Sequence, residues 1–363
     1  MQLAKWMWIS NMKILSIIDS FKGTITSLRL GELVKEEQEK KGNEVKSIAI
    51  ADGGDGFLDA ISQNIPLDKV YINVCDPLFR KVESYYMLSK DKKTAYIELA
   101  KASGINMLRE EELNPFITST YGFGEMIYDA VKKNVENIVI GIGGSATNDC
   151  GSGMLEALGA KFNEGKLTRM NNEKLSLIES LDLSLVKELC KNINVTVLSD
   201  VTNPLLGANG ATYVFSKQKG STEKTMPILE NNIKHFASFK DEYINYPGSG
   251  AAGGVGFSLK TFLNAKMVSG IDYLLDVINY DNLYKDYDLI ITGEGKIDSQ
   301  SMQGKVISSI IKRTKDRKII LVCAINEIKD SQYEILSIVN DKVTKEMSMS
   351  DPETYFRMMI QKI

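Results

Sequence analysis

Short apolar runs without polar alternation recur along this chain, and most of them end abruptly in glycine and acidic residues. Uninterrupted Ile, Val and Leu are typical of strands covered on both faces, as in a parallel sheet between layers of helices. The runs are KILSIIDS at 13–20, SIAIADGGDG at 47–56, NIVIGIGGSATND at 137–149, NVTVLSDVTN at 194–203, DLIITGEGKID at 288–298 and KIILVCAIN at 318–326. They predict an α/β fold assembled from βαβ units.

Helical patterns fill the intervals between these runs. Ser27 is a predicted N-cap for the first helix, and Gly42 is its predicted stop. Near the other end, Asp351 and Pro352 form a cap and first-turn pair before an apolar stripe that reaches Ile363. In open parallel sheets, ligands bind beyond the carboxyl ends of the strands. The glycine and acidic residues that follow the runs are therefore expected at a ligand-binding edge.

Charge and composition argue against nucleic acid or an anionic membrane as a partner. Lys plus Arg number 44 and Asp plus Glu 47, which gives a net charge of −3 without a basic block. With 43% apolar and 25% charged residues, the chain has an ordinary globular composition and can bury a sizeable core. Its 363 residues are long for one core, so two domains are expected. A homo-oligomer is compatible with this composition.

The N-terminal segment lacks the pattern of a targeting signal or a membrane span. Lys5, Asn11 and Lys13 interrupt its apolar residues before a continuous apolar core can form. Residues 1–11 are interpreted either as a dispensable extension or as incidental packing against the domain.

Cysteine spacing and the single histidine narrow the available chemistry. The four cysteines are far apart and lack any CxxC spacing, so neither a disulfide framework nor a zinc site is indicated and a reducing cytoplasm is favoured; they are Cys75, Cys150, Cys190 and Cys323. His235 stands in the polar stretch NNIKHFASFK, and an exposed position is expected for it. Because this only histidine stands away from every glycine cluster, Ser-His and Cys-His triads and multi-histidine metal sites are nearly excluded. The chemistry is left to carboxylates, lysines, backbone amides and a metal ion.

Two glycine patterns test a dinucleotide-binding function. Gly141, Gly143 and Ala146 fit G-x-G-x-x-A, and a second set at 248–253 fits G-x-G-x-x-G. The first lacks a clear acidic strand end near position 164, and the second follows Tyr246 and Pro247 instead of a strand. No Walker A loop is present. Recurrent glycine loops nevertheless suit phosphate, because glycine lets backbone N–H groups approach an anion closely.

Carboxylates and a lysine near strand ends supply the parts that phosphoryl transfer needs: a proton acceptor or Mg²⁺ ligands, and a cation near the transferred group. The candidates are Asp19 with Lys22, Asp52 with Asp55, Asp149, Asp200, and Glu294 with Asp298. A structural alternative applies to Asp55, Asp149 and Asp298, each of which can cap a helix or close an Asx turn.

Taken together, the motifs resemble the bacterial glycerate kinase family, typified by the glyoxylate-utilisation and galactarate-pathway enzymes. The matching segments run in order from about residue 13 to about residue 325: DSFKGT at 19–24, ADGGDG at 51–56, IELAKASG at 97–104, STYGFGE at 119–125, GIGGSATND at 141–149, SDVTNPLLGANGA at 199–211, KQKG at 217–220, GSGAAGGVG at 248–256 and ITGEGKIDSQSMQGK at 291–305. This many long motifs in one order is far more specific than any single glycine loop.

The resemblance implies ATP-dependent phosphorylation of D-glycerate with Mg²⁺, with 2-phosphoglycerate as the expected product, in the cytoplasm. It also implies two α/β domains, one with a Rossmann-like parallel sheet built from both chain ends and the other inserted as the middle part. We place the discontinuous domain at 12–75 plus 285–363 and the inserted domain at 76–284.

Roles for individual residues follow from matching these motifs. We expect Gly143, Gly144 and Ser145 to cradle phosphate, Asp200 or else Asp52 to act as the base, and Lys22 to offset charge on the transferred group or on the glycerate carboxylate. Glu294 and Asp298 are the expected Mg²⁺ ligands. Further substrate- or phosphate-binding candidates are Asp19, Ser20, Gly53, Gly54, Asn203, Lys219, Gly253 and Gly254.

The sequence departs from the family pattern at three places. Cys150 and Phe79 stand where the family usually has glycine, and Asn171 with Asn172 replaces the usual glycine pair. We expect Phe79 and Asn172 in peripheral turns, where Asn tolerates a positive φ and Phe does not. Cys150 adjoins the proposed phosphate loop, so any effect there falls on affinity.

Other functions remain open at this stage. A kinase for another small hydroxy acid would share these motifs, because a pocket discriminates one extra carbon by only about 1–3 kcal/mol. A nicotinamide-dependent oxidoreductase would use the two glycine patterns. A non-catalytic protein would bind ATP without turnover.

Overall fold

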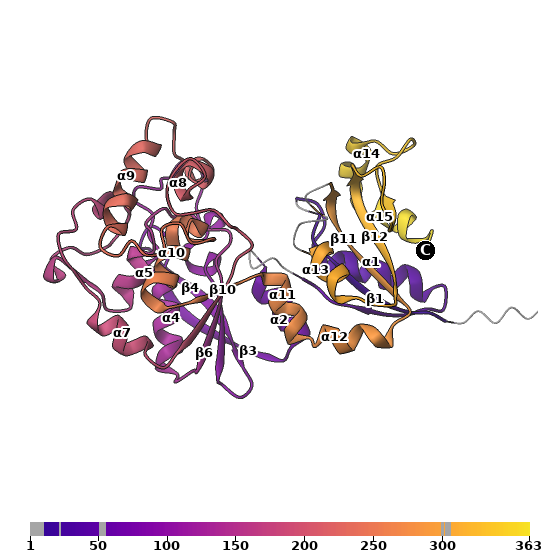
Figure 1. The fold of residues 1–363 in the computed structure, drawn as a ribbon, viewed down its shortest axis with the longest axis horizontal. Coiled ribbons are helices and arrows are strands. Elements are labelled where there is room, and N and C mark those ends of the chain that lie inside the picture. Colours follow the sequence, from indigo (N-terminus) through magenta and orange to yellow (C-terminus); the bar gives the residue numbers. More distant parts are fainter. Residues whose placement is uncertain (1–10, 22, 51–55, 299–300, 302–305) are drawn as a thin grey trace, which may run out of the picture. The chain divides into compact units, whose positions relative to one another are not determined.

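A computed structural model describes residues 11–21, 23–50, 56–298, 301 and 306–363. The chain divides into two compact units, which are called here the terminal unit and the central unit (Figure 1). The terminal unit consists of Met1–Ala51 and Ile271–Ile363, and the central unit of Asp52–Gly270. The predicted α/β class, with one unit drawn from both chain ends and the other inserted between them, is confirmed.

The terminal unit is built on a fully parallel sheet of five strands in the order β13-β12-β11-β1-β2. Figure 1 shows the indigo β1 and the orange β11 and β12 in this one sheet. The strands are β1 (Lys13–Ile18), β2 (Glu44–Ser47), β11 (Leu289–Ile297), β12 (Lys318–Asn326) and β13 (Glu334–Ser337). Consecutive residues of β1 and β11 are buried, and because neighbouring residues point to opposite faces, both faces of these strands are covered.

Two local predictions in this unit need correction. The second strand ends at Ser47, where the apolar run was expected to begin, so Ile48, Ala49 and Ile50 are buried beyond the strand. The first helix is capped by Thr26, whose hydroxyl accepts a hydrogen bond from Arg29 N, and not by Ser27. The Ser27 hydroxyl instead donates to Ile18 O and accepts from Ile50 N.

The helices of the terminal unit pack on this sheet and on one another. They are α1 (Ser27–Glu39), α11 (Gly270–Val277), α12 (Tyr280–Leu283), α13 (Val306–Arg313), α14 (Lys345–Ser350) and α15 (Pro352–Ile360), with a 3₁₀ turn η5 (Tyr284–Asp286). Helix α1 packs on β1 and on α15. As predicted, Asp351 caps α15 and Pro352 begins it, and Phe356 is buried against the edge of Phe21.

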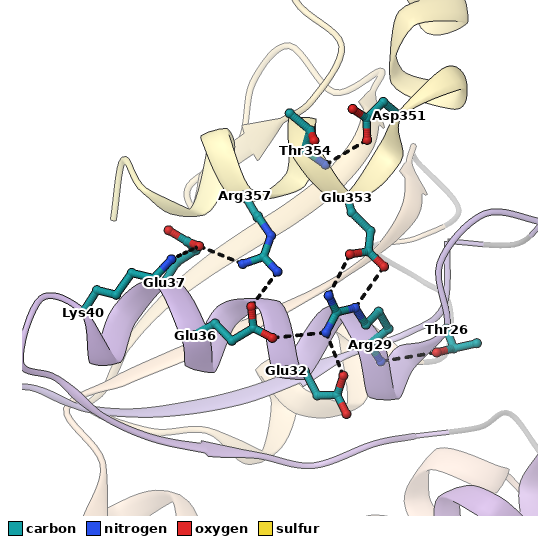
Figure 2. Close-up of polar contacts among 10 residues, drawn as sticks. All are labelled: Thr26, Arg29, Glu32, Glu36, Glu37, Lys40, Asp351, Glu353, Thr354 and Arg357. Carbon is teal, nitrogen blue, oxygen red and sulfur yellow. Dashed lines mark hydrogen bonds and ion pairs between the residues drawn. The ribbon is translucent and has the colours of Figure 1, made fainter.

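An ion-pair network joins the outer faces of α1 and α15 (Figure 2). Arg29 contacts Glu32, Glu36 and Glu353, and Arg357 contacts Glu36 and Glu37. The Glu37 side chain is 3% exposed, and hydrogen bonds from Lys40, Gln361 and Arg357 lower its pKa to about 2. Ion pairs thus join α1 and α15, in addition to the apolar residues that the two helices bury together.

The central unit contains a mixed sheet of six strands in the order β10-β9-β6-β5-β4-β3. Its strands are β3 (Leu67–Cys75), β4 (Lys81–Ser89), β5 (Thr94–Glu98), β6 (Asn137–Gly141), β9 (Asn194–Leu198) and β10 (Lys266–Val268), and a separate small pair is formed by β7 (Lys161–Phe162) and β8 (Leu181–Asp182). Strands β5, β6, β9 and β10 are parallel, whereas β3 and β4 form an antiparallel hairpin. This hairpin was not among the predicted strands.

The hairpin also bears on where the two units divide. Strand β3 pairs along its whole length with β4, so residues 57–75 lie in the central unit, whereas the sequence-based division placed them with the chain ends. Likewise, residues 271–284 lie in the terminal unit. Phe79 lies in the hairpin turn with φ 62°, and its ring contacts the Tyr121 ring and the Arg169 guanidinium group.

The helices of the central unit surround a large apolar core under its sheet. They are α2 (Phe57–Asn64), α3 (Ala100–Ser103), α4 (Tyr121–Lys132), α5 (Ser152–Ala157), α6 (Asn172–Leu175), α7 (Ser184–Cys190), α8 (Ala211–Phe215), α9 (Met226–Ala237) and α10 (Ala251–Leu263), with 3₁₀ turns η1 (Ile105–Met107), η2 (Glu110–Glu112), η3 (Asn163–Gly165) and η4 (Lys217–Lys219). His235 lies exposed on α9, as expected. In the part of the chain that is described, every helix is too short or too polar to cross a bilayer.

Candidate active site

Three neighbouring parallel strands of the central unit end at the same edge of its sheet. Glu98, Gly141 and Leu198 are in register across β5, β6 and β9. The segments that follow these positions carry Lys101, the 142–150 loop and Asp200. This is the edge where open parallel sheets bind ligands.

The loop after β6 presents the three residues predicted to cradle phosphate. Gly144 lies at its exposed tip with φ 71°, a conformation that favours glycine, and Gly143 is half-buried. Gly144 O accepts a hydrogen bond from Ile105 N at 2.8 Å, and Ser145 forms a bridge with Gly104. Ser145 is 6% exposed. The Gly144 carbonyl therefore anchors the loop, while the tip of the loop stays accessible to solvent.

Lys219 lies beneath this loop, not on its surface. Its side chain is 2% exposed, and Nζ donates to Ser145 Oγ and to Thr147 O, both at 2.7 Å. Burial lowers the pKa of Lys219 to about 7, although the negative charge of Asp149 acts in the opposite direction. The expectation that Lys219 touches the ligand directly remains a prediction, and both of these hydrogen bonds from Nζ go to the loop.

Asp149 organises the backbone at the end of the loop. Its Oδ2 accepts hydrogen bonds from Thr120 N, Thr120 Oγ1 and Gly153 N, and its Oδ1 accepts from Gly151 N, over 2.7–3.2 Å. The carboxyl group is fully buried, and burial raises its pKa against the effect of these bonds. These contacts match the structural alternative that the sequence left open for Asp149.

The second glycine loop packs against the first. A Cβ on Gly253 would lie 2.0 Å from Thr147 O, and Gly253 O accepts a hydrogen bond from Cys150 N. Gly254 has φ 92°, and a Cβ there would lie 2.8 Å from Cys150 Sγ. Cys150 itself has φ 55°, which explains why glycine is usual at this position in the family pattern. The close approach of the two backbones requires small residues at 253 and 254, whatever they bind.

A buried amide network supports the same loop, and sequence reasoning missed it. The Nδ2 of Asn172 donates to Asn148 O at 2.8 Å, and its Oδ1 accepts from Asn232. Asn172 is fully buried at the start of α6, so its expected place in a peripheral turn is wrong. Asn148 Nδ2 and Thr147 Oγ1 are buried without a hydrogen-bond partner among the described residues. Polar atoms of this kind suit a ligand or an ordered water.

Glu98 also lies at this edge, and no role was predicted for it. Its carboxylate is fully buried, accepts hydrogen bonds from Gly56 N and Leu58 N, and lies 3.6 Å from Lys101 Nζ. Glu98 therefore fixes the start of α2, directly after the ADGGDG motif. Asp52, Asp55, Gly53 and Gly54 of that motif, and Lys22, lie outside the described residues.

Asp200 and Asn203 follow β9 at this edge. The Oδ2 atom of half-buried Asp200 is shielded from solvent. Asn203 donates from Nδ2 to Asn209 O at 2.8 Å, and its backbone oxygen accepts from Gly250 N. The structure thus brings Asp200 to the same strand-end edge as Gly143–Ser145, whereas the Asn203 amide braces its own loop.

In the terminal unit, the acidic residue Asp19 follows β1 and Glu294 lies within the neighbouring strand β11. Ile18 of β1 pairs with Gly293 of β11, and Asp19 N donates to Gly293 O, so Asp19 and Glu294 each stand one residue beyond a registered pair. Asp19 Oδ1 accepts from the backbone N of Ser20 at 2.7 Å. Such adjacent positions in neighbouring strands are about 5 Å apart.

Asp298 is held by its own turn. Its Oδ1 accepts from Ser301 N at 3.1 Å, and its Oδ2 lies 3.5 Å from Lys296 Nζ. Among the described residues, no group of three His, Cys, Asp or Glu side chains could enclose a metal ion. Magnesium commonly takes one or two carboxylates and fills its other positions with phosphate and water. The pair Asp19 and Glu294 fits that pattern better than Glu294 with Asp298.

Comparison with known proteins identifies the family. The sequence profile of the glycerate kinase family matches residues 14–363. The chain is 39% identical over 314 residues to a glycerate kinase of Bacillus cereus, with 84% of this chain and 82% of the relative covered. It is 38% identical over 304 residues to a glycerate 2-kinase of Escherichia coli, with 81% and 80% covered. The chain belongs to the glycerate kinase family.

The fold of this glycerate kinase family member is shared with a solved relative. A crystal structure from Salmonella typhimurium, described as a glycerate kinase 2, superposes with a TM-score of 0.82 at 32% identity and covers 97% of both chains. The resemblance deduced from the motifs and the enzyme class it implied are thus confirmed.

The glycine patterns do not form dinucleotide fingerprints. The helix after β6 begins only at Ser152. The 248–253 pattern does not follow a strand, and three of its residues have a positive φ: Gly248 at 94°, Ala252 at 53° and Gly253 at 66°. A nicotinamide-dependent oxidoreductase is therefore not supported by the local geometry.

Proposed function

We propose that this chain transfers the γ-phosphoryl group of ATP to D-glycerate, with Mg²⁺, and releases 2-phosphoglycerate. The proposal rests on the family and on one structural observation: the register of β6 and β9 brings Gly143–Ser145 and Asp200 to one edge of the central sheet. The name of the Escherichia coli relative, glycerate 2-kinase, supports the 2-phospho product.

The central unit would supply the donors and the base. The backbone N–H groups at the accessible Gly143–Gly144 tip and the Ser145 hydroxyl are suited to phosphate oxygens, since glycine allows close approach of an anion. Asp200 would accept the proton of the attacking glycerate hydroxyl. In that step the hydroxyl oxygen bonds to the γ-phosphorus, the bond from this phosphorus to the bridging oxygen breaks, and ADP leaves.

A metal-binding candidate lies in the terminal unit. Asp19, one residue beyond β1, and Glu294, at the neighbouring position within β11, would provide carboxylate oxygens for Mg²⁺. Asp298, which the sequence analysis assigned to the metal, would instead fix the turn that follows β11.

We also propose a cellular location, from the state of the cysteines. The four cysteines are free thiols in the structure, Cys75, Cys150 and Cys323 being buried and Cys190 half-buried. Free thiols are typical of a reducing compartment, so we place the reaction in the cytoplasm. A homo-oligomer stays a prediction.

Asp200→Asn tests the assignment of the base. We expect folded protein with kcat lowered by about 10²- to 10⁴-fold, the usual contribution of a positioned general base, measured by ADP release with D-glycerate. Asp182→Asn, at the exposed end of β8 in the same unit, is the matched control and should keep wild-type kcat. Wild-type turnover in Asp200→Asn would remove Asp200 from this role.

A further inference from the structure

The buried amino group of Lys219 contacts two atoms of one loop. Nζ lies 2.7 Å from Ser145 Oγ and 2.7 Å from Thr147 O, and the residue is 2% exposed. Its neighbour Lys217, two residues earlier in η4, is exposed. A lysine that only contributed charge to the surface would not be enclosed in this way. The geometry ties the amino group to the loop that carries the proposed phosphate contacts.

The protonation state of Lys219 decides what the Ser145 hydroxyl can do. A carbonyl oxygen such as Thr147 O only accepts, so it takes one N–H in either state. An ammonium group has no lone pair, and Ser145 Oγ must then accept from Nζ, which leaves the serine proton available for another acceptor. A neutral amine has a lone pair that can accept the serine proton instead. The same 2.7 Å contact is therefore compatible with two opposite hydroxyl orientations.

Among the described residues, Asp149 is the titratable group that acts on Lys219. Its buried carboxylate favours the charged amine, whereas burial favours the neutral one, and the resulting pKa of about 7 puts both forms within the neutral pH range. Ser145 and Thr147 supply the direct contacts.

We propose that protonated Lys219 is a positioning residue that holds the Ser145 hydroxyl as a hydrogen-bond donor to a phosphate oxygen of the nucleotide. Lys219 does not touch the phosphate itself; it acts through Ser145 and fixes the loop through Thr147 O. This inference rests on the proposed function of the Gly143–Ser145 loop. Its consequence is that phosphate affinity falls when Lys219 loses its proton, and that bound nucleotide favours the protonated lysine in return.

The first experiment measures the lysine itself and does not need turnover. In protein labelled with ¹³C at the lysine ε-carbons, the Lys219 signal is assigned by its loss in Lys219→Met and titrated between pH 5.5 and 9, with and without MgATP. We expect MgATP to raise the apparent pKa of Lys219 in the wild type and to raise it less in Ser145→Ala. An identical MgATP effect in the two proteins would overturn the proposal, as would no effect in either.

The second experiment separates positioning from structural support. Lys219→Met should lower kcat/KM for ATP by about 10- to 100-fold, the range for losing a charge-assisted hydrogen bond, while Lys217→Met should not change it. If Lys219 acts through Ser145, adding Lys219→Met to Ser145→Ala should lower kcat/KM by less than about twofold further. A full additional loss in the double variant contradicts the proposal.

The pH profile distinguishes the failure of this inference from the failure of the proposed function. The KM for ATP of the wild type should rise as the pH increases through about 7, and the rise should be absent in Ser145→Ala. Turnover of D-glycerate with a flat profile overturns the role of Lys219 alone. No turnover, together with the expected MgATP effect on the lysine signal, contradicts the substrate assignment and leaves the role of Lys219 standing.

Discussion

Replacing Asp149 tests whether the carboxylate at the end of the 142–150 loop has a structural role. Asp149→Asn keeps the volume and removes the charge. Three of the four hydrogen bonds reach Oδ2 and one, from Gly151 N, reaches Oδ1. An asparagine would therefore turn its oxygen toward Thr120 and Gly153 and leave its NH₂ group facing the N–H of Gly151.

The expected loss follows from this arrangement. A buried N–H that faces another donor costs about 1–2 kcal/mol, and each of the three remaining bonds loses about 0.5 kcal/mol of charge assistance. Relief of the buried charge offsets part of this sum, because burial already raises the pKa of Asp149. We expect the free energy of unfolding to fall by about 2–3 kcal/mol.

The measurement is urea unfolding followed by far-ultraviolet circular dichroism at pH 7. Asp182→Asn is the matched control, because the exposed Asp182 accepts a hydrogen bond from Ser184 N, and an amide oxygen can accept the same bond. That control should stay within about 0.5 kcal/mol of the wild type. If Asp149→Asn is as stable as Asp182→Asn, the hydrogen bonds to Asp149 do not hold the loop and the reasoning is refuted.

Two further predictions concern pH and thiol reactivity. Hydrogen bonds from Lys40, Gln361 and Arg357 lower the pKa of Glu37 from 4.5 to about 2, so its stabilisation is present above pH 4.5 and is lost as the pH falls toward 2. Glu37→Gln should therefore lower the free energy of unfolding by about 1–2 kcal/mol at pH 7 and by much less at pH 2.5. Glu39→Gln, exposed on the same helix, should leave the free energy of unfolding unchanged at both pH values. Equal losses for Glu37→Gln at pH 7 and pH 2.5 would contradict the network of Figure 2. Burial, and then the charge of Asp149, raise the pKa of the Cys150 thiol. The thiol should therefore resist iodoacetamide at pH 8 in the native protein and react only in urea, which peptide mapping can measure. Rapid labelling of Cys150 in the native protein would contradict its burial.

The parallel core could be predicted because its strands are buried on both faces. Continuous apolar runs such as NIVIG at β6 and LIIT at the start of β11 have this cause, and the structure places strands on both. The β3–β4 hairpin escaped prediction because its strands show neither a continuous apolar run nor a regular alternation: most of β3 is exposed or half-buried, and the two nine-residue strands together contain two Lys, one Glu and three Tyr. Periodicity alone gave no strong signal there.

Residue roles were less predictable than the family. Motif order identified the glycerate kinases, but burial separates residues that a motif treats alike. Lys219 was predicted from KQKG as a substrate- or phosphate-binding residue, and its side chain is enclosed beneath the 142–150 loop; Asn172 was expected in a peripheral turn and is fully buried. These differences arise from long-range contacts, since Lys219 meets Ser145 across 74 positions of the chain. A local pattern carries no information about such a partner.

The proposed phosphorylation of D-glycerate is most directly tested by ³¹P NMR of the purified protein with ATP, Mg²⁺ and D-glycerate. We expect loss of the ATP γ-phosphate signal together with new signals of ADP and 2-phosphoglycerate. A 3-phosphoglycerate signal would contradict the proposed hydroxyl, and intact, folded protein that yields no phosphoglycerate would contradict the proposed substrate.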